Sequence, residues 1–545
     1  MLFFRECFVR FSLCIIFVAI SAGLFGAWDW AYSIGAASME RIWDINCDSQ
    51  SNIYAVGDFT DSLWVDNQSY SGFGLSDSFV VKYSNSGEVL WVKTFGSASE
   101  DVALSVGIDA VGNCYVGGYF VDTLTCQDTN VVSNGMWDAY VAKFDPLGNL
   151  IWLRSFGGTM NDIGYGLAAS PSGRVYVTGW FAGTISFPNG SSITSAGGSD
   201  VFCCAMDTDG NYLWAQRGGR ESVEYGYEVA CDDAGNAYVT GVASLGSVFG
   251  AFTLSSDGMF VCKYNPDGIE QWLAPSSGAS VIDIAVQPLA NNNQYGMVCG
   301  RLTNSGTIGG FSYSTLNGSE DAYWAKFDAN TGNWIDMQSY GGILSDKGKD
   351  VDCEDYPAFL ASFEGDAVFG SNNFSSNGES DIALGFGSGH MNFTAVGGDN
   401  SEIPTSIKIL PNGKIAIAGW HFGLTQFGDF TLDTGNVANL NAFIACYSTQ
   451  SSSDDPIANP NAISLSPNPF HNSLKITIDK TGLAPMTVDI YNLKGQKVRS
   501  LSSEDDRDDE RIFYWNGQDM HGKTCSSGVY LLKAGSSLSR ALKLN

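Results

Sequence analysis

Histidine is scarce in this chain, and so are the short motifs built on nucleophiles and metal ligands. Only 4 of the 545 residues are histidines. The chain has no HExxH segment, no GxSxG elbow and no CxxC pair. These absences weaken an assignment to the common metalloenzymes and serine hydrolases. The sequence therefore predicts neither a bound metal nor a cofactor.

Positively charged residues are also few. Lys and Arg together number 28 against 58 Asp and Glu, which gives a formal net charge of -30. A surface of this sign repels polyanions. The composition argues against nucleic acid and anionic lipid as partners, and it leaves extracellular glycans and proteins as candidate ligands.

Long apolar runs are missing except near the start of the chain. Two arginines precede an apolar run at residues 11–25 that contains small residues, as in a cleavable signal peptide. We expect a signal peptide at 1–27, cleaved between Ser21 and Ala27, and no membrane anchor in the mature chain. A permanent anchor is the alternative, although the core of the run is short for a membrane span.

Cysteine does not form a recognisable framework. Cys7 and Cys14 lie in the expected signal peptide, which leaves 13 − 2 = 11 elsewhere. An odd number without metal-ligand spacing favours buried apolar packing. A disulfide between Cys114 and Cys126 stays open as an alternative.

What the chain does have is a repeat of about sixty residues. Two copies read LWVKTFGSASEDVALSVGIDAVGNCYVGGYF and IWLRSFGGTMNDIGYGLAASPSGRVYVTGWF. Seven copies span residues 28–449, and the last, from Met391, keeps the pattern without its tryptophan. The tryptophans that mark the copies are Trp30, Trp91, Trp152, Trp214, Trp272 and Trp334.

Each copy holds four short apolar segments of strand length with little helical periodicity. A lone strand at 28–34 precedes the first copy, while the last copy lacks its fourth strand. The first strand would therefore complete the last sheet and leave no severe exposed edge. We predict an all-β fold in which residues 28–449 form a seven-bladed β-propeller closed by its N-terminal strand.

The segments DAVGN, DPLGN, DTDGN and DDAGN recur between the apolar segments. They place Asp early and Gly where a tight hairpin needs positive φ. We interpret them as hairpin turns. Calcium binding by the recurring acids is the alternative.

The stretches DAYVAKFDPLGNLIW and GRVYVTGWF resemble the bacterial β-propeller repeat called SBBP. The likeness is strongest in the second and third copies and fades in the fifth and sixth. The resemblance implies the fold and an extracellular setting. It implies no catalytic residue.

The end of the chain loses the repeat. Residues 450–462 are polar and rich in turn formers, as in a linker, and residues 463–545 alternate as in a small Ig-like β-sandwich. This tail resembles the type A sorting domain of type IX (Por) secretion through SPNPF, DIYNLKGQKV, WNG and SGVY; the motif residues are Pro467, Asn468, Pro469, Gly528 and Tyr530.

That resemblance implies transfer from the periplasm across the outer membrane of a Gram-negative bacterium, with the type IX machinery as a partner. The product would be released or held at the cell surface. A permanent FlgD-like or Ig-like accessory module is the alternative.

Candidate ligand-binding residues occupy equivalent places in the copies. Glu40, Asp101, Asp162 and Glu224 precede the expected innermost strands and could ring the channel mouth, on the face that carries the longer connections. Solvated or strand-capping acids are the alternative interpretation.

Aromatic residues follow a glycine that recurs at the end of the second strand. Tyr119, Trp180 and Trp420 at this position could stack on sugar rings, and packing between blades is the alternative. The leading hypothesis is a monomeric, non-catalytic binding or scaffold protein. A secreted glycan hydrolase that uses channel-mouth carboxylates is the second hypothesis.

Overall fold

The computed structural model contains only β-strands and connecting turns, with no helix among the residues that it describes. It divides into two compact units, Met1–Ser451 and Ser452–Asn545. The described residues are 26–35, 39–286, 294–315, 319–353, 356–387, 390–436, 439–449, 463–466, 470, 473–479, 487–492, 497–502, 505–506, 510–534 and 537–543. The predicted all-β class is confirmed, while the predicted linker and nearly all of the predicted signal peptide lie outside the described residues.

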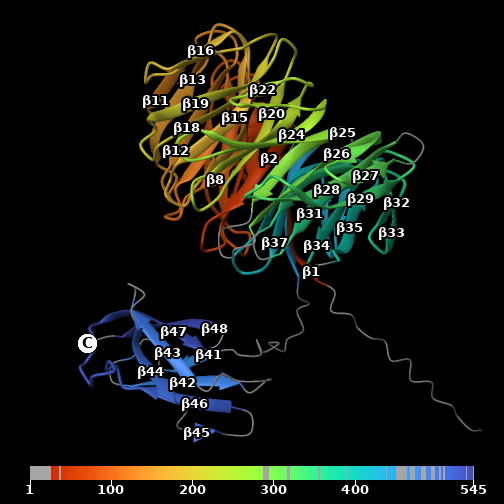
Figure 1. Cartoon of the computed structure of the whole chain (residues 1–545). Helices are drawn as coiled ribbons and strands as arrows, with labels where there is room; N and C mark the ends of the chain where they lie inside the picture. The colour runs from red at the N-terminus through yellow and green to blue at the C-terminus, as the bar shows by residue number, and fades with distance from the viewer. Residues whose placement is uncertain are drawn as a thin grey trace, which may run out of the picture. The chain divides into compact units, whose positions relative to one another are not determined.

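The larger unit repeats one arrangement of four antiparallel strands. In the clearest copy the order is β13(Leu150–Phe156), β12(Asp138–Phe144), β9(Cys114–Phe120) and β8(Asp101–Ile108). A hairpin of β10(Thr123–Cys126) and β11(Thr129–Val132) fills the connection between its second and third strands. Figure 1 shows these sheets following one another along the chain.

The other copies have the same order. Their strands are β2(Glu40–Cys47), β3(Ile53–Phe59), β6(Asp77–Tyr83) and β7(Val89–Phe95); β14(Asp162–Ala169), β15(Val175–Phe181), β18(Asp200–Met206) and β19(Tyr212–Gly219); β20(Tyr225–Cys231), β21(Ala237–Ala243), β24(Gly258–Tyr264) and the first part of β25(Glu270–Val286); the rest of β25 with β26(Tyr295–Ile308), β28(Glu320–Asp328) and β29(Trp334–Gly342); β30(Lys347–Asp352), β31(Ala358–Phe363), β34(Asp381–Phe386) and β35(Asn392–Gly398); and β36(Glu402–Ile409), β37(Ile415–Phe422), β40(Leu440–Ser448) and β1(Ala27–Ile34).

The last sheet takes its fourth strand from the start of the chain. β1 pairs antiparallel with β40 from Ala27 opposite Ser448 to Ile34 opposite Ala442. The first strands of neighbouring units also contact one another in a closed cycle that runs β2, β8, β14, β20, β25, β30, β36 and back to β2. The units therefore have no terminal member whose first strand lacks a neighbour.

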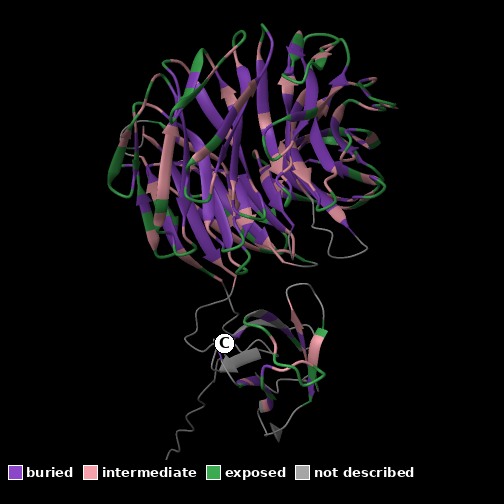
Figure 2. Ribbon diagram, turned by 90° about the vertical axis from the view of Figure 1, so that its left-hand side faces the viewer, coloured by how far each residue is buried: buried purple, intermediate pink, exposed green. Residues whose placement is uncertain are grey.

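Alternate residues within a strand pack into two different apolar clusters, and they do not divide into one buried and one solvent-exposed set. Tyr140 and Ala142 of β12 pack into one cluster, whereas Ala139 and Val141 of the same strand pack into the next. All of β12 is buried for this reason. Figure 2 shows the buried residues concentrated in the strands and the exposed ones at turns and connections.

One contact between neighbouring units explains the repeated tryptophans and glycines together. Gly148 adopts φ 81° in the turn between the third and fourth strands, and a Cβ there would lie 3.0 Å from the Trp91 ring of the preceding unit. The Trp91 indole N–H donates to the Pro146 carbonyl of the same turn at 3.1 Å. Similar indole contacts occur at Gly87 with Trp30, Gly210 with Trp152, Gly268 with Trp214 and Gly332 with Trp272.

The Asp residues of the DAVGN, DPLGN, DTDGN and DDAGN segments stabilise the hairpin turns. Asp145 Oδ1 accepts hydrogen bonds from the backbone N–H groups of Leu147 at 2.9 Å and Asn149 at 2.8 Å. The Asn149 amide donates to the other carboxylate oxygen at 2.8 Å. These bonds lower the pKa of Asp145. The carboxylate is thus engaged by its own turn, as the hairpin interpretation requires.

The smaller unit consists of two four-stranded antiparallel sheets. One contains β41(Ile463–Ser466), β42(Leu474–Asp479), β46(Glu510–Trp515) and β45(Asp505–Asp506), and the other contains β44(Lys497–Ser502), β43(Thr487–Asn492), β47(Gly528–Ala534) and β48(Ser537–Lys543). Phe470, Ile490, Trp515 and Tyr530 belong to their shared apolar cluster.

Candidate functional site

Each first strand of the larger unit carries a β-bulge at the same place. In β2 the register shifts between Ile42 and Asp44, so that Trp43 is the extra residue. A bulge re-aims one side chain while the strand continues. The residues at the bulges are Trp43, Leu104, Tyr165, Tyr227, Ile282, Lys349 and Thr405.

Most of these bulge residues line one pocket of about 630 Å³. Its aromatic lining consists of Trp43, Tyr119, Tyr165, Tyr227 and Trp420. Second strands end here and the long connections begin, which is the face predicted for ligand binding. The volume and the apolar walls are those of a small-molecule site.

Acidic side chains next to the bulges form the floor of this pocket. They are Asp44, Glu228, Asp283 and Asp350. Asp44 accepts hydrogen bonds from the Val106 N–H at 2.8 Å and from the Ser105 hydroxyl at 3.0 Å in the next unit. Burial raises the pKa of Asp44 to about 6.

Asp283 and Asp350 are hydrogen-bonded to each other through their side chains. Such a bond needs a proton on one of the two carboxyl groups. Burial, then the nearby Asp283 charge, raises the pKa of both Asp350 and Glu228 well above the ordinary value. Burial and the neighbouring charge therefore favour the protonated, O–H-donating forms of Asp350 and Glu228.

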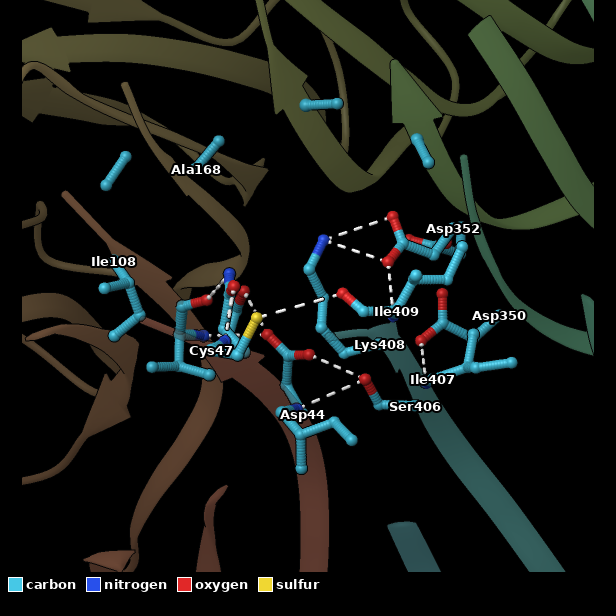
Figure 3. Close-up of a pocket in the computed structure, with 18 of the residues that line it drawn as sticks. Asp44, Cys47, Ile108, Ala168, Asp350, Asp352, Ser406, Ile407, Lys408 and Ile409 are labelled. Atoms are coloured by element: carbon cyan, nitrogen blue, oxygen red, sulfur yellow. Dashed lines mark hydrogen bonds and ion pairs between the residues drawn. The ribbon is translucent and has the colours of Figure 1, made fainter. Parts of the chain in front are cut away.

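A second pocket, of about 600 Å³, opens at the opposite ends of the first strands. It shares all four floor acids, Asp44, Glu228, Asp283 and Asp350, with the first pocket. Figure 3 shows Lys408 paired with Asp352 there, with Nζ and Oδ2 3.0 Å apart. Acidic and aliphatic residues line this end, and the aromatic walls are confined to the first pocket.

The predicted ligand acids Asp101, Asp162 and Glu224 are fully buried. Ser97 donates to Asp101 Oδ2 through its backbone N–H and its hydroxyl, both at 2.6 Å. The Gly158 N–H donates to Asp162 at 2.6 Å and the Arg220 N–H to Glu224 at 3.2 Å. Each acid thus holds the turn that enters its strand, and none of the three lines either of the two pockets described above.

Each of these acids has a second acid beside it, at the start of the third strand of the preceding unit. Burial is the main cause of the raised pKa of Asp101, to about 7, and the Asp77 charge adds to it. Asp138 acts in the same way on Asp162. The pairs are Asp77 with Asp101, Asp138 with Asp162, Asp200 with Glu224, Asp321 with Asp346 and Asp381 with Glu402.

One junction lacks both acids of the pair. Gly258 starts β24 opposite Ala243, as Asp77 starts β6 opposite Phe59. Its expected partner position is Ala279, within β25. Here β25 continues from one sheet into the next without the turn that the acids hold elsewhere. At the junction between the last unit and the first, Asn441 stands in place of the third-strand acid while Glu40 is retained, so the two positions do not vary strictly together.

The three predicted aromatic residues lie in different surroundings. Trp420 packs edge-on against Trp43 with centroids 5.0 Å apart, and the Tyr119 hydroxyl donates to Glu100 at 3.0 Å. Both line the first pocket. Trp180 instead packs against Tyr225 at 5.8 Å and lines neither of the two pockets described above.

Sequence reasoning missed the bulge residues and the floor acids. Their signal is present in the repeat: WDI, LSV, YGL, YEV, IDI, KDV and TSI align as a bulge residue, a variable residue and an apolar residue. The middle position alternates among acid, Ser and Gly, unlike the residues around it. That variation could have marked the pocket lining.

In the smaller unit, Gly528 begins β47, and Tyr530 is buried with its hydroxyl donating to the Ser526 carbonyl at 2.7 Å. Pro467, Asn468 and Pro469 lie outside the described residues. The described residues include no helix long and apolar enough to cross a membrane.

The segment from Gly517 to Thr524 reads GQDMHGKT and has the spacing of a P-loop, which the sequence interpretation overlooked. It connects β46 to β47, with no helix after it among the described residues. Asp519 accepts the backbone N–H groups of His521 at 2.9 Å and Lys523 at 3.0 Å. The segment is a turn between strands, and it lacks the helix N-terminus on which a P-loop depends.

Comparison with known families concerns the end of the chain. Residues 464–543 match the secretion system C-terminal sorting domain. This sorting tail implies secretion to the cell surface or beyond it, as predicted. The match covers the last part of the chain and leaves the repeats unassigned.

Two curated proteins resemble shorter stretches. An uncharacterized WD repeat-containing protein of Acanthamoeba polyphaga mimivirus is 25% identical over 222 residues, covering 34% of this chain and 16% of that protein. The regulatory protein FlaEY of Caulobacter vibrioides is 27% identical over 142 residues, covering 25% and 15%. The chain therefore spans less than a fifth of the length of each relative.

Solved structures are similar at low scores. The quinohemoprotein alcohol dehydrogenase of Comamonas testosteroni aligns with TM-score 0.38 and 9% identity, covering 93% of this chain and 78% of that one. PorZ, a type-IX secretion component of Porphyromonas gingivalis, aligns with TM-score 0.13 and 12% identity, covering 94% and 100%. Similarity at this level carries no argument about function.

Proposed function

We propose that this chain is a secreted or cell-surface binding protein, exported by the type IX pathway and without catalytic activity. One observation carries the binding role, namely the pocket walled by aromatic side chains at the face with the long connections. The sorting tail supports the route of export. The sequence that leads into β1 serves as the signal peptide in this proposal.

The proposed architecture is a seven-bladed β-propeller of the SBBP type at 28–449, a linker at 450–462 and an Ig-like β-sandwich at 463–545. Each four-stranded repeat would be one blade. The pairing of β1 with β40 and the closed cycle of first strands support this arrangement. The pocket would then be one mouth of the central channel.

A glycan is the ligand class that suits this pocket. The flat faces of aromatic rings pack against the apolar faces of sugar rings, and carboxyl groups at the floor can bond to hydroxyls. In this proposal Tyr119 and Trp420 contact the ligand. Asp101, Asp162, Glu224 and Trp180 stabilise the loops that surround the pocket.

The test is a glycan-array screen of the full secreted chain, followed by calorimetry with any glycan that binds. We expect Trp420→Ala to weaken binding at least about tenfold, or roughly 1.4 kcal/mol. Trp180→Ala is the matched control, since it removes an equivalent aromatic residue outside the pocket. Equal effects of the two variants, or no glycan bound by the folded chain, would overturn the proposal.

A glycan hydrolase is the second candidate function. The hydrogen-bonded pair Asp283 and Asp350 favours it, because an acid and a base in one pocket can serve general acid–base catalysis. Mass spectrometry of glycans incubated with the protein distinguishes the two. Cleavage that Asp350→Asn abolishes would support hydrolysis, whereas intact bound glycan supports the binding role.

A further inference from the structure

Lys349 is the residue of the aromatic pocket whose chemistry the proposed function leaves unused. It is the bulge residue of β30, between Gly348 and Asp350, and it lines the pocket. Within the described part of the chain its ammonium forms no hydrogen bond or ion pair. The other cation of the pocket, Arg41, is already engaged, with its guanidinium 2.7 Å from Asp58.

The charged groups around Lys349 do not neutralise the positive charge of its ammonium. Arg301 and Lys347 lie nearby, and both are paired with Glu320, at 2.6 and 3.3 Å. Burial first, and then Lys347, lowers the pKa of Lys349 to about 8. The buried Cys299 thiol is also close, and burial raises its pKa so that it stays neutral.

The acids of the pocket are occupied in other ways. Glu100 accepts the Tyr119 hydroxyl, and Asp44 accepts the Val106 N–H and two serine hydroxyls. Asp350 accepts the Ile407 N–H at 2.6 Å besides its bond to Asp283. Glu228 accepts its neighbour's N–H, from Val229, at 2.9 Å.

We propose that the pocket binds a ligand that carries a carboxylate, an acidic sugar, and that Lys349 forms the ion pair with it. This inference rests on the proposed binding function and names its ligand class. An acidic floor ordinarily suggests a cation, but these acids already accept hydrogen bonds from backbone N–H groups and serine hydroxyls. The charged group of the pocket that has no hydrogen-bond or ion-pair partner among the described residues is therefore Lys349.

Because the protein has a net charge of -30, any preference for an acidic ligand must come from contacts within the pocket. Long-range repulsion disfavours any anion, so an acidic ligand must gain its attraction within the pocket. A desolvated amine among aromatic walls can supply that attraction, because a charge pair strengthens where water is excluded. Protonated floor acids can then donate to ring hydroxyl oxygens.

The experiment uses the full secreted chain and two forms of one oligosaccharide, a uronic-acid oligomer and the same oligomer with its carboxylates reduced to alcohols. Calorimetry at pH 7 gives both affinities. We expect the acidic form to bind at least about tenfold more tightly. Lys349→Met should abolish this preference, and Lys349→Arg should keep it.

The preference should also weaken as the pH rises through about 8, where Lys349 loses its proton. Lys347→Met is the matched control, since Lys347 is paired with Glu320 and does not line the pocket. Circular dichroism and the melting temperature of each variant identify any that fail to fold.

The outcomes separate the two proposals. Equal binding of both oligomers, unaffected by Lys349→Met, would overturn the ligand class and leave glycan binding intact. Failure of acidic, reduced and neutral glycans alike to bind the folded protein would overturn the proposed function itself. Loss of the preference in Lys347→Met as well as Lys349→Met would also contradict the assignment to Lys349.

Discussion

Asp77 and Asp101 come from neighbouring repeat units, and each keeps one carboxylate oxygen buried without a hydrogen-bond partner among the described residues. The other oxygen of each holds a turn: Phe73 donates to Asp77 at 2.7 Å and Ser97 donates to Asp101. Two buried acids side by side cannot both ionise without cost. The pair therefore makes the stability of the fold depend on pH.

We predict that the protein loses stability as the pH rises. The pKa of Asp101 is about 7 in the folded chain against an ordinary value of 3.8, so the folded state binds more protons between these values. Stability is then highest below this window and falls through it. Urea titrations at a series of pH values measure this slope.

Asp77→Asn should flatten that slope and stabilise the protein on the order of 1–2 kcal/mol at pH 8, because an amide carries no charge and can donate to Asp101. Asp145→Asn is the control, since hydrogen bonds lower the pKa of Asp145. It should destabilise the protein at the same pH. A slope unchanged by Asp77→Asn would contradict the role of the pair.

The turn glycines allow the cost of backbone strain to be separated from the cost of a clash. Gly268 has φ 79° and a Cβ there would lie 2.5 Å from the Trp214 ring, whereas Gly413 has φ 83° and open space. We expect Gly413→Ala to cost about 1 kcal/mol. Gly268→Ala should cost a further ~1–3 kcal/mol through overpacking, measured by urea unfolding; equal costs would show that the indole contact is unimportant.

The closing strand should contribute through its buried side chains. Ile34 of β1 is 1% exposed and belongs to the cluster of the first unit, while Tyr32 in the same strand is 43% exposed. Ile34→Ala should destabilise the larger unit by roughly 2–4 kcal/mol, and Tyr32→Ala by under about 1 kcal/mol. Thermal unfolding of both variants checks this, and similar losses would argue against closure by β1.

The sorting tail should be required for release, and its folding should depend on Tyr530. This ring packs at 5.0 Å from Trp515 in the core of the smaller unit. Tyr530→Ser removes that packing and should leave the protein in the periplasm. Tyr530→Phe keeps the ring and should be exported at close to the normal level, as immunoblots of cell fractions can show; export of both variants would contradict the prediction.

The all-β class and the antiparallel strands could be predicted from the repeats. The repeated tryptophan and turn glycine contact each other, as Trp91 and Gly148 do, so the same packing constraint recurs in the sequence. The burial of Asp101 could not be predicted in the same way. An acid before a strand is compatible with a channel mouth and with a turn, and only the position of Ser97 decides between them.

The pocket was harder still to predict. Trp43 and Lys349 reach it through bulges, which shift side chains by one position and break the alternation on which strand prediction depends. Trp180 and Trp420 stand at equivalent places in the repeat, yet their neighbours differ, with Tyr225 beside one and Trp43 beside the other.

The pairing of Ala27 with Ser448 has a consequence for the order of events during synthesis and transport. A chain that emerges from its N-terminus presents β1 first, hundreds of residues before β40 exists to receive it. Sheets in the middle can form as they appear, but the last one cannot. Until then β1 has no strand to pair with and its exposed backbone groups are a template for association with other chains, so completion of the fold must wait for arrival of the whole repeat region.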